Sequence, residues 1–337
     1  GTVPGMPSGF DPNPPYGTMC SGISSDKDGN IWFSQARIKE YLSVIKRNGQ
    51  LETYSFDQSR GYSRKTFVDK NNYVWVLHED GGGITVLNHS NFKKADYKVL
   101  TNNPGEGNLQ SKEVFSIAED KDGKIWVGTA EGISVFYNSA AIFGTGNFDA
   151  QPIKIVQDGN VELLLSKEAV SAIVVDGANN KWVGTMQGGV YCFSPDGLKQ
   201  LHHFTKENSP LYSNTVLDLA YDEVTGDVFI ASDAGVQSYR GIIVVGEEKY
   251  SDVYAYPNPV KPNYPGSVLI RGLMDNSIVK ITDESGNMVW ETKSTGGQIE
   301  WPLQTFAAAR VTSGVYVVYA STTNGEFKAA TKILVIN

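Results

Sequence analysis

The amino-acid sequence predicts an all-β protein, and three of its properties support this class. Many short runs rich in Val and Ile lie among 35 glycines and 17 tyrosines, a composition that favours strands and tight turns. One segment with strand-like alternation recurs five times along the chain. The last part of the chain lacks this repeat but also consists of short apolar runs separated by turn residues. Because 337 residues are about twice the length of an average domain, we expect two domains.

The recurring segment is clearest between Val114 and Tyr137, where the sequence reads VFSIAEDKDGKIWVGTAEGISVFY. An apolar run ends in an aspartate, and a short turn rich in Gly and Asn follows. Next come an aromatic residue flanked by apolar ones, a glycine and a second alternating run. This order predicts three strands joined by hairpins. The other copies begin at Cys20, Lys65, Val170 and Val216.

The central aromatic residues of the five copies lie 43, 51, 56 and 47 residues apart, which is the length of a β-propeller blade. These residues are Trp32, Trp75, Trp126, Trp182 and Phe229. We interpret all five as structural, because a blade can bury an aromatic residue on its face only against the next blade. Fourth strands that would complete the blades are expected to begin at Leu51, Ala95, Ile153, Leu198 and Gly241.

We therefore predict a β-propeller over residues 1–250, with five four-stranded blades visible. Five is below the usual six to eight blades, and the chain begins inside what resembles a first blade. We expect a longer parent chain to supply further blades. The turns Asp26–Gly29 and Asp120–Gly123 also resemble part of a calcium loop, but the closing Glu of an EF-hand is missing. A hairpin turn is the favoured interpretation, because Asp-Gly is a strong hairpin signal.

The IWVGT and KWVGT cores, each preceded by V-x-x-I-x-x-D, resemble the two-component-regulator propeller repeat. Such repeats occur in periplasmic sensor regions and in proteins similar to streptogramin lyases. The resemblance is specific for the fold and weak for the function.

A second domain is predicted after the repeat stops. The motif YPNPV at Tyr256 holds two prolines, which predict a stiff linker over residues 251–256 and a new domain over residues 257–337. Short strands are expected to begin at Ser267, Ser277, Asn287, Gln298, Gly314 and Phe327. Their spacing predicts a small β-sandwich.

This tail resembles the C-terminal sorting domain of the type IX secretion system, an immunoglobulin-like sandwich. The resemblance rests on YPNPV, the ITDxxGN hairpin from Ile281, the SGVY segment from Ser313 and the terminal KILVI from Lys332, and only the TFAAAR segment from Thr305 departs from the family. Five propeller repeats followed by this tail are similar to the C-terminal part of propeller-bearing surface proteins of that system. The resemblance implies an exported protein of Bacteroidetes type, in the periplasm or on the outer cell surface, with secretion or attachment proteins or anionic lipopolysaccharide as partners.

The charge balance and the cysteine content exclude several classes of ligand and cofactor. The formal net charge is −8, and acids and bases balance from Asp252 onward, so the whole acidic excess lies before that residue. Sequence-independent binding to nucleic acid or an anionic membrane is therefore not expected. Two cysteines without a CxxC motif or His/Cys pairs provide no zinc or redox motif, and we expect no cofactor and no metal. No apolar run is long enough to span a membrane, and no signal peptide is recognisable at Gly1.

Catalytic residues are not expected. The adjacent His202 and His203 point to opposite faces of a predicted strand and are interpreted as structural. His78 or Glu79 is conceivable as the general base of a lyase, but nothing else in the sequence converges on them. Cys192 is interpreted as a core residue. The loop aromatics Tyr62, Phe143 and Tyr212 either stack on sugars or close loops, and both alternatives stay open.

The candidate ligand-binding residues are four bases of the tail, Arg271, Lys280, Arg310 and Lys328. If a glycolipid phosphate binds, these residues should contact it, because the acidic propeller repels polyanions. The alternative is that they are ordinary solvated charges. We expect a non-enzymatic cell-surface binding or assembly protein of a type IX secretion system. The alternative function is a ligand-sensing periplasmic propeller of a two-component-type sensor.

Overall fold

A computed structural model of the chain describes residues 20–35, 41–54, 56, 63–89, 96–157, 160–241, 244–250, 252–326 and 328–337. Within these residues the structure is almost entirely β, and the single helical element is η1, a 3-10 turn at Ser139–Phe143. The predicted all-β class is confirmed. No helix among the described residues has the length and apolar character needed to cross a membrane.

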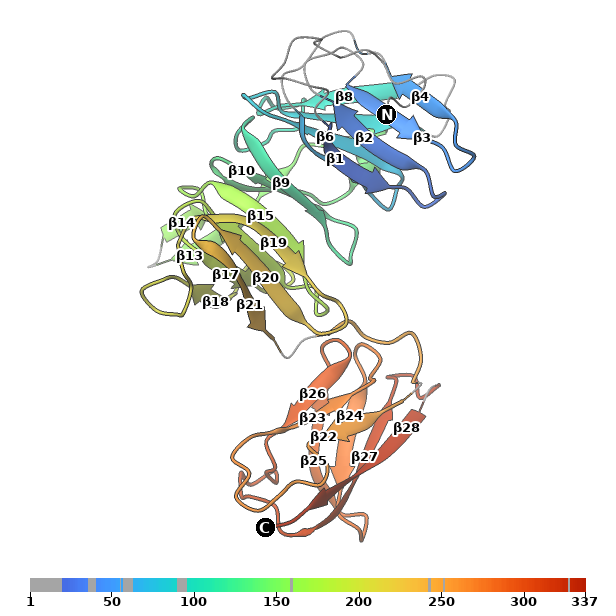
Figure 1. Ribbon diagram of the computed structural model, residues 1–337, viewed down its shortest axis with the longest axis vertical. Coiled ribbons are helices and arrows are strands. Elements are labelled where there is room, and N and C mark those ends of the chain that lie inside the picture. Colours follow the sequence, from blue (N-terminus) through green and yellow to red (C-terminus); the bar gives the residue numbers. More distant parts are fainter. Residues whose placement is uncertain are drawn as a thin grey trace. The chain divides into compact units, whose positions relative to one another are not determined.

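Four copies of the repeat form four-stranded antiparallel sheets whose strands follow chain order, and we call these sheets blades (Figure 1). The first blade contains β1 (Cys20–Ser25), β2 (Ile31–Gln35), β3 (Leu42–Ile45) and β4 (Leu51–Tyr54). The second contains β5 (Ser63–Val68), β6 (Tyr73–His78), β7 (Ile84–Asn88) and β8 (Asp96–Leu100). The third contains β9 (Val114–Glu119), β10 (Ile125–Thr129), β11 (Gly132–Phe136) and β12 (Gln151–Pro152). The fourth contains β15 (Val170–Val175), β16 (Lys181–Thr185), β17 (Val190–Phe193) and β18 (Gln200–Phe204).

Two of the expected fourth strands differ from the structure. The strand expected from Ile153 is not the outer strand of the third blade, because β12 takes that position. Instead β13 (Lys154–Gln157) turns back on β14 (Asn160–Leu163) in a separate hairpin. The fifth repeat forms a sheet of three described strands, β19 (Val216–Tyr221), β20 (Asp227–Ser232) and β21 (Gly235–Arg240). The strand expected from Gly241 falls partly on residues 242–243, which lie outside the described residues.

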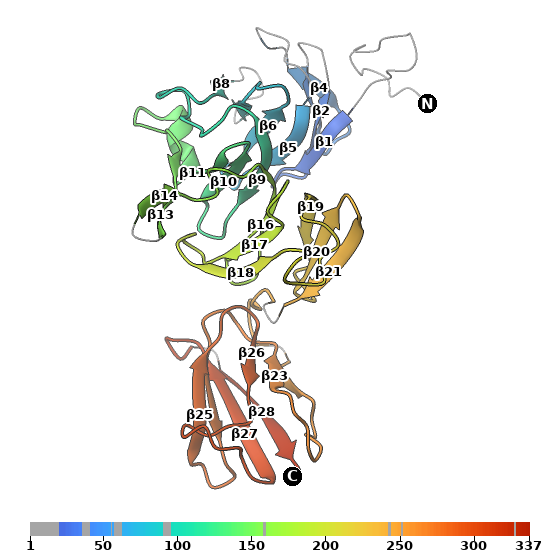
Figure 2. The same cartoon turned by 90° about the vertical axis from the view of Figure 1, so that its left-hand side faces the viewer.

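The first strands of successive blades lie beside one another. β1 contacts β5 and β5 contacts β9 (Figure 2), and β9 contacts β15 (Figure 1). Short side chains make polar contacts between these first strands and their neighbouring blades. Thr66 Oγ1 donates to Ser34 Oγ at 2.7 Å, and Ser116 Oγ donates to the carbonyl of Val170 at 3.1 Å. Small polar residues therefore satisfy each other where the blades approach most closely.

The glycine two positions after the tryptophan in the third and fourth copies is explained by the next blade. A Cβ atom at Gly128 would lie 2.2 Å from Ser116 Oγ and 2.7 Å from the carbonyl oxygen of Val170. A Cβ atom at Gly184 would lie 2.6 Å from a methyl carbon of Val216. Val170 and Val216 are the first residues of the next blades' first strands. A residue without a side chain at this position lets successive blades pack closely.

The four repeat tryptophans and Phe229 have different environments. Trp32, Trp75, Trp126 and Trp182 are all buried. Phe229 is 41% exposed, so the fifth aromatic residue does not fill a core position as we expected. A phenyl ring has no N–H donor, and Phe229 follows the aspartate of its repeat, Asp222, by seven positions instead of the six found in the other copies.

The tail consists of two antiparallel sheets. The three-stranded sheet contains β22 (Tyr254–Tyr256), β23 (Val268–Arg271) and β26 (Gln298–Trp301). The four-stranded sheet, in the order β25-β24-β27-β28, contains β24 (Ile278–Thr282), β25 (Met288–Lys293), β27 (Gly314–Ser321) and β28 (Lys328–Val335). Both sheets contribute to one hydrophobic core, which includes Ile270, Trp301, Val279, Val318 and Ile333.

The YPNPV motif pairs with the tail instead of serving only as a spacer. Asn258 Nδ2 donates to the carbonyl of Lys332 at 2.7 Å, and its Oδ1 accepts from the amide of Leu334 at 3.0 Å. The amide of Val260 donates to the carbonyl of Leu334 at 2.8 Å. The two prolines beside Asn258 have no backbone N–H to donate. The side-chain amide of Asn258 thus pairs with β28 as a backbone amide would, with one donor and one acceptor.

The segment before this motif also differs from a free linker. Residues Tyr254–Tyr256, which we expected in the linker, form β22 and pair with β23. The compact unit that contains the tail comprises residues 176–180, 220–230 and 236–337. Within it, the amide of Gly297 donates to the carbonyl of Val244 at 2.8 Å, and the amide of Glu247 donates to the carbonyl of Leu273 at 2.9 Å. The boundary of the tail's packing therefore lies before residue 251.

Candidate functional site

The aspartate of each repeat is used to build a turn. In the third blade, Asp120 Oδ1 accepts from the amides of Asp122 and Lys124 at 3.0 and 2.9 Å. Its Oδ2 accepts from the indole N–H of Trp126 at 3.0 Å. The same bond to tryptophan joins Asp26 to Trp32 at 2.9 Å and Asp69 to Trp75 at 3.1 Å. These bonds give the carboxylate the role of a hairpin organiser.

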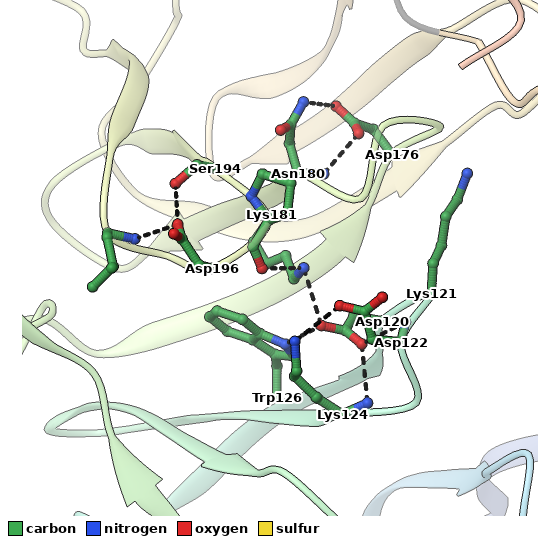
Figure 3. A network of polar contacts seen from close by, with 12 residues as sticks. Asp120, Lys121, Asp122, Lys124, Trp126, Asp176, Asn180, Lys181, Ser194 and Asp196 are labelled. Carbon is green, nitrogen blue, oxygen red and sulfur yellow. Dashed lines mark hydrogen bonds and ion pairs between the residues drawn. The ribbon is translucent and has the colours of Figure 1, made fainter. Parts of the chain in front are cut away.

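A buried lysine joins the third and fourth blades at one of these turns (Figure 3). Lys181 Nζ lies 3.1 Å from Asp120 Oδ2, and both side chains are fully buried. The ammonium also donates to the carbonyl of Pro195 at 2.8 Å and lies 4.8 Å from the centre of the Trp126 ring. The other blades have Ile31, Val74 or Ile125 next to the aromatic residue, so this ion pair is particular to the fourth copy.

The ionisation of this pair follows from its surroundings. Burial raises the pKa of Asp120, but the hydrogen bonds from Trp126 and the Lys124 amide, together with the charge of Lys181, outweigh it and hold the pKa below the ordinary value. Burial lowers the pKa of Lys181, and the Asp120 carboxylate opposes this change. The pair is a structural contact between blades.

His78 and Glu79, considered above as bases of a lyase, are committed to other contacts. His78 is fully buried, and its Nε2 lies 2.9 Å from Thr85 Oγ1. Glu79 forms an ion pair with Arg64 at 3.5 Å. His78 is therefore closed off from solvent, and an ion pair occupies the carboxylate of Glu79.

The other candidates from the propeller lie apart from one another. His202 stacks on Trp182, and His203 stacks on Tyr191 with 3.9 Å between ring centres. Cys192 is buried. The two loop aromatics that the structure describes are Phe143, which packs against the core of the second and third blades, and Tyr212, which is exposed. Tyr62 lies outside the described residues.

The structure brings two of the four predicted tail bases onto one surface. Lys280 of β24 and Lys328 of β28 are exposed. In the alternation of each strand they lie on the face opposite to that of the buried Val279 and Ile333. They therefore project from the outer face of the four-stranded sheet. Two further exposed lysines, Lys293 of β25 and Lys332 of β28, occupy the same face by strand register. We call Lys280, Lys293, Lys328 and Lys332 the lysine face.

The lysine face is also partly apolar. Tyr319, directly opposite Lys280 on β27, is 50% exposed, and Leu334 on β28 is 42% exposed. The acidic group on this face is Glu291, which lies 4.0 Å from Lys280. Four cations against one anion give this face a local positive charge, beside one exposed tyrosine ring and the methyl groups of Leu334.

The two arginines do not belong to the lysine face. Arg271 lies on β23 of the other sheet, opposite Gln298 and Tyr254. Arg310 follows the turn in the TFAAAR segment, and its Nη2 donates to the carbonyl of Tyr264 at 2.9 Å. The sequence reasoning missed Lys293 and Lys332, although period-two alternation along the predicted strands would have placed both on the same face as Lys280 and Lys328.

Comparisons with known proteins support the propeller assignment. A family model described as two component regulator propeller matches residues 108–131. The chain is similar to the solved structure of PorZ, an essential bacterial surface component of the type IX secretion system of Porphyromonas gingivalis, with 28% identity and a TM-score of 0.64. That match covers 96% of this chain and 46% of PorZ, so this chain spans about half the length of its relative. The predicted propeller repeat and the likeness to PorZ are confirmed.

Two further structures are more distant. The extracellular domain of a one-component system from B. thetaiotaomicron is 14% identical, with a TM-score of 0.49, and the match covers 94% of this chain and 44% of that one. Virginiamycin B lyase from Staphylococcus aureus is 13% identical, with a TM-score of 0.42, and the match covers 94% of both chains. No curated protein matches the chain.

Proposed function

We propose that the protein is an exported, non-enzymatic binding or assembly component of a type IX secretion or surface-attachment system. The observation that carries the proposal is the match to PorZ, which extends over 96% of the chain and therefore includes the tail as well as the propeller. The proposal assigns the protein to the periplasm or the outer cell surface. It treats the tail as an immunoglobulin-like sorting or docking sandwich.

Within this proposal the lysine face is the docking surface for an anionic partner, and the phosphates of lipopolysaccharide are the chemistry that it would contact. The propeller carries the whole acidic excess of the chain and repels a polyanion, whereas the tail is neutral overall and does not. Attraction on the tail would come from the local positive charge of the lysine face. Lysine ammonium groups act as point charges for phosphate, and Tyr319 and Leu334 offer apolar contact beside them.

The test is titration of purified anionic lipopolysaccharide into the full chain. We expect saturable binding that weakens as salt is raised. A variant with glutamine at all four positions of the lysine face should bind about tenfold more weakly or worse. The matched control, Arg271→Gln with Arg310→Gln, removes tail bases outside this face and should bind as the native chain does. Equal binding by the native chain and the lysine-face variant would contradict the assignment of the surface.

The alternative function is a ligand-sensing periplasmic propeller. The match of residues 108–131 to the two component regulator propeller model is compatible with this alternative. A sensor of this type takes its ligand on the propeller, and its tail needs no affinity for an anion. Binding of lipopolysaccharide that the lysine-face variant does not alter would favour this second function.

A further inference from the structure

A cavity of about 560 Å³ lies between the β13–β14 hairpin and the fourth blade. The hairpin contributes Ile155 and Leu163 to its lining, and the fourth blade contributes Tyr191 of β17 and His203 of β18. The volume lies within the range of pockets that hold small organic ligands. The hairpin is extra to the four strands of the third blade and accounts for the longest spacing of the repeat, 56 residues. Insertions of this kind in repeat proteins often line binding surfaces.

Polar groups converge on one wall of the cavity, around Gly188. A Cβ atom at Gly188 would lie 2.8 Å from the hydroxyl oxygen of Tyr191 and 3.1 Å from Glu168 Oε1. His203 Nε2 lies 2.8 Å from the carbonyl oxygen of Gly188, and its ring stacks on Tyr191. Stacking and this hydrogen bond hold the phenol in place, and the missing side chain at Gly188 leaves room for the carboxylate beside it.

Electrostatics in the cavity favour a cation. The lining contains the carboxylates of Glu162 and Glu168 against one ammonium, that of Lys167. Burial, followed by the negative charge of Glu168, raises the pKa of Tyr191, so the phenol stays a hydrogen-bond donor or acceptor at neutral pH. The acidic excess of the propeller adds a long-range attraction for cations.

Much of the remaining lining is apolar, and a backbone turn fixes part of it. Ile155, Leu163, Leu164 and Leu198 provide branched aliphatic side chains. Leu165, in the loop between β14 and β15, has a φ of 55°, in the left-handed region that a branched residue seldom occupies. The amide of Glu168 donates to the carbonyl of Leu165 at 2.9 Å, so the same turn fixes the apolar wall and the carboxylate. Strain of this kind is found where a binding site is organised in advance.

We propose that this cavity binds a small amphiphilic amine, whose apolar body packs on the leucine wall and whose protonated amino group contacts the carboxylate of Glu168. The Tyr191 hydroxyl accepts a second hydrogen bond from the same amino group. This binding site is separate from the lysine face and takes a ligand of opposite charge, so it does not depend on the function proposed for the tail.

The test uses dansylcadaverine, a fluorescent amine with an aromatic body, and its N-acetyl derivative, which has the same body without the charge. Emission of the dansyl group reports binding to the full chain. We expect the amine to bind about tenfold more tightly than the acetylated probe, because a charge-assisted hydrogen bond is lost on acetylation. The isosteric variant Glu168→Gln should abolish this preference and leave the affinity for the acetylated probe unchanged.

Two further variants separate the cavity from general attraction to an acidic surface. Glu284→Gln removes an exposed carboxylate of the tail and should leave both affinities unchanged. Gly188→Ala inserts a methyl group against Tyr191 and Glu168 and should lower the affinity for the amine probe. Gly146→Ala, which has open space around its Cβ, should leave that affinity unchanged. Equal affinity for the two probes, no binding of either, or an unchanged preference in Glu168→Gln would each overturn the proposal.

Discussion

Replacing Lys181 by methionine should destabilise the folded chain by about 3 to 5 kcal/mol. Methionine keeps the length and apolar volume of the lysine stem, which is fully buried between the third and fourth blades. It removes the ammonium that lies 3.1 Å from Asp120 Oδ2 and donates to the carbonyl of Pro195 at 2.8 Å. The Asp120 carboxylate then stays in the interior without a counter-charge, and this is the main source of the loss.

The size of the effect depends on what Asp120 retains. The carboxylate still accepts from the Trp126 indole and from the amides of Asp122 and Lys124, so we expect the lower part of the range, about 3 kcal/mol. The double variant Asp120→Asn with Lys181→Met has no buried charge. It should therefore be more stable than Lys181→Met alone by about 1 to 2 kcal/mol.

Urea unfolding of the full chain at pH 7, followed by tryptophan fluorescence, measures these differences. Lys27→Met, at an exposed turn position of the first repeat, is the matched control and should change stability by less than about 0.5 kcal/mol. A loss below about 1 kcal/mol in Lys181→Met, or a double variant no more stable than the single one, would refute the assignment of the pair as a contact that holds the blades together.

The same pair has a predictable dependence on pH. The pKa of Asp120 is lower in the folded chain than in the unfolded chain, so its stabilising contribution is complete above the unfolded value. That contribution is lost as pH falls through the folded pKa, which places the loss below about pH 4. Removing Lys181 takes away a cause of the lowered pKa, so Lys181→Met loses less stability on acidification than the native chain does. Its stability deficit, measured by urea unfolding at several pH values, should therefore shrink as the pH falls below about 4.

Three further outcomes are expected from stability measurements. Gly128→Ala should lose several kcal/mol, because its Cβ would lie 2.2 Å from Ser116 Oγ of its own blade and 2.6 to 2.7 Å from Val170 of the next blade. Gly146→Ala should be close to neutral, and urea midpoints compare the two. Trp126→Ala should lose about 3 to 5 kcal/mol and Phe229→Ala less than about 1.5 kcal/mol. Equal losses would contradict the different burial of these two rings. A tail beginning at residue 244 should melt at a higher temperature than one beginning at residue 257, because the second lacks β22, and equal melting temperatures would show that β22 adds no stability.

Sequence reasoning predicted correctly the propeller elements that repeat and the short strands of the tail from Val268 onward. The aspartate, the turn and the tryptophan recur in the first four copies, and one copy is enough to explain the others. The glycine two positions after the tryptophan recurs in the third and fourth copies, where Val170 and Val216 of the next blade lie against it. The errors occur where a copy departs from this pattern. Phe229 lacks the donor that the aspartate needs, and the segment from Ile153 forms a hairpin of its own instead of an outer strand. Neither departure alters the alternation of apolar and polar residues along the strands. The period of that alternation alone could therefore not predict either departure.

The two candidate binding surfaces differ in how far they could be predicted from the sequence. The lysine face follows from alternation along three strands, and a register in the predicted sheet would have grouped Lys293 and Lys332 with Lys280 and Lys328. The cavity depends on the packing of a hairpin against a blade some 30 to 50 residues further along the chain. The one sequence signal for it is the 56-residue spacing, which exceeds the other spacings and marks where a blade carries more chain than four strands require. The other blades fold without an equivalent of these extra residues, so the residues are not needed to build a blade. In a repeat protein, a search for a ligand site should therefore begin at the copy with the longest spacing.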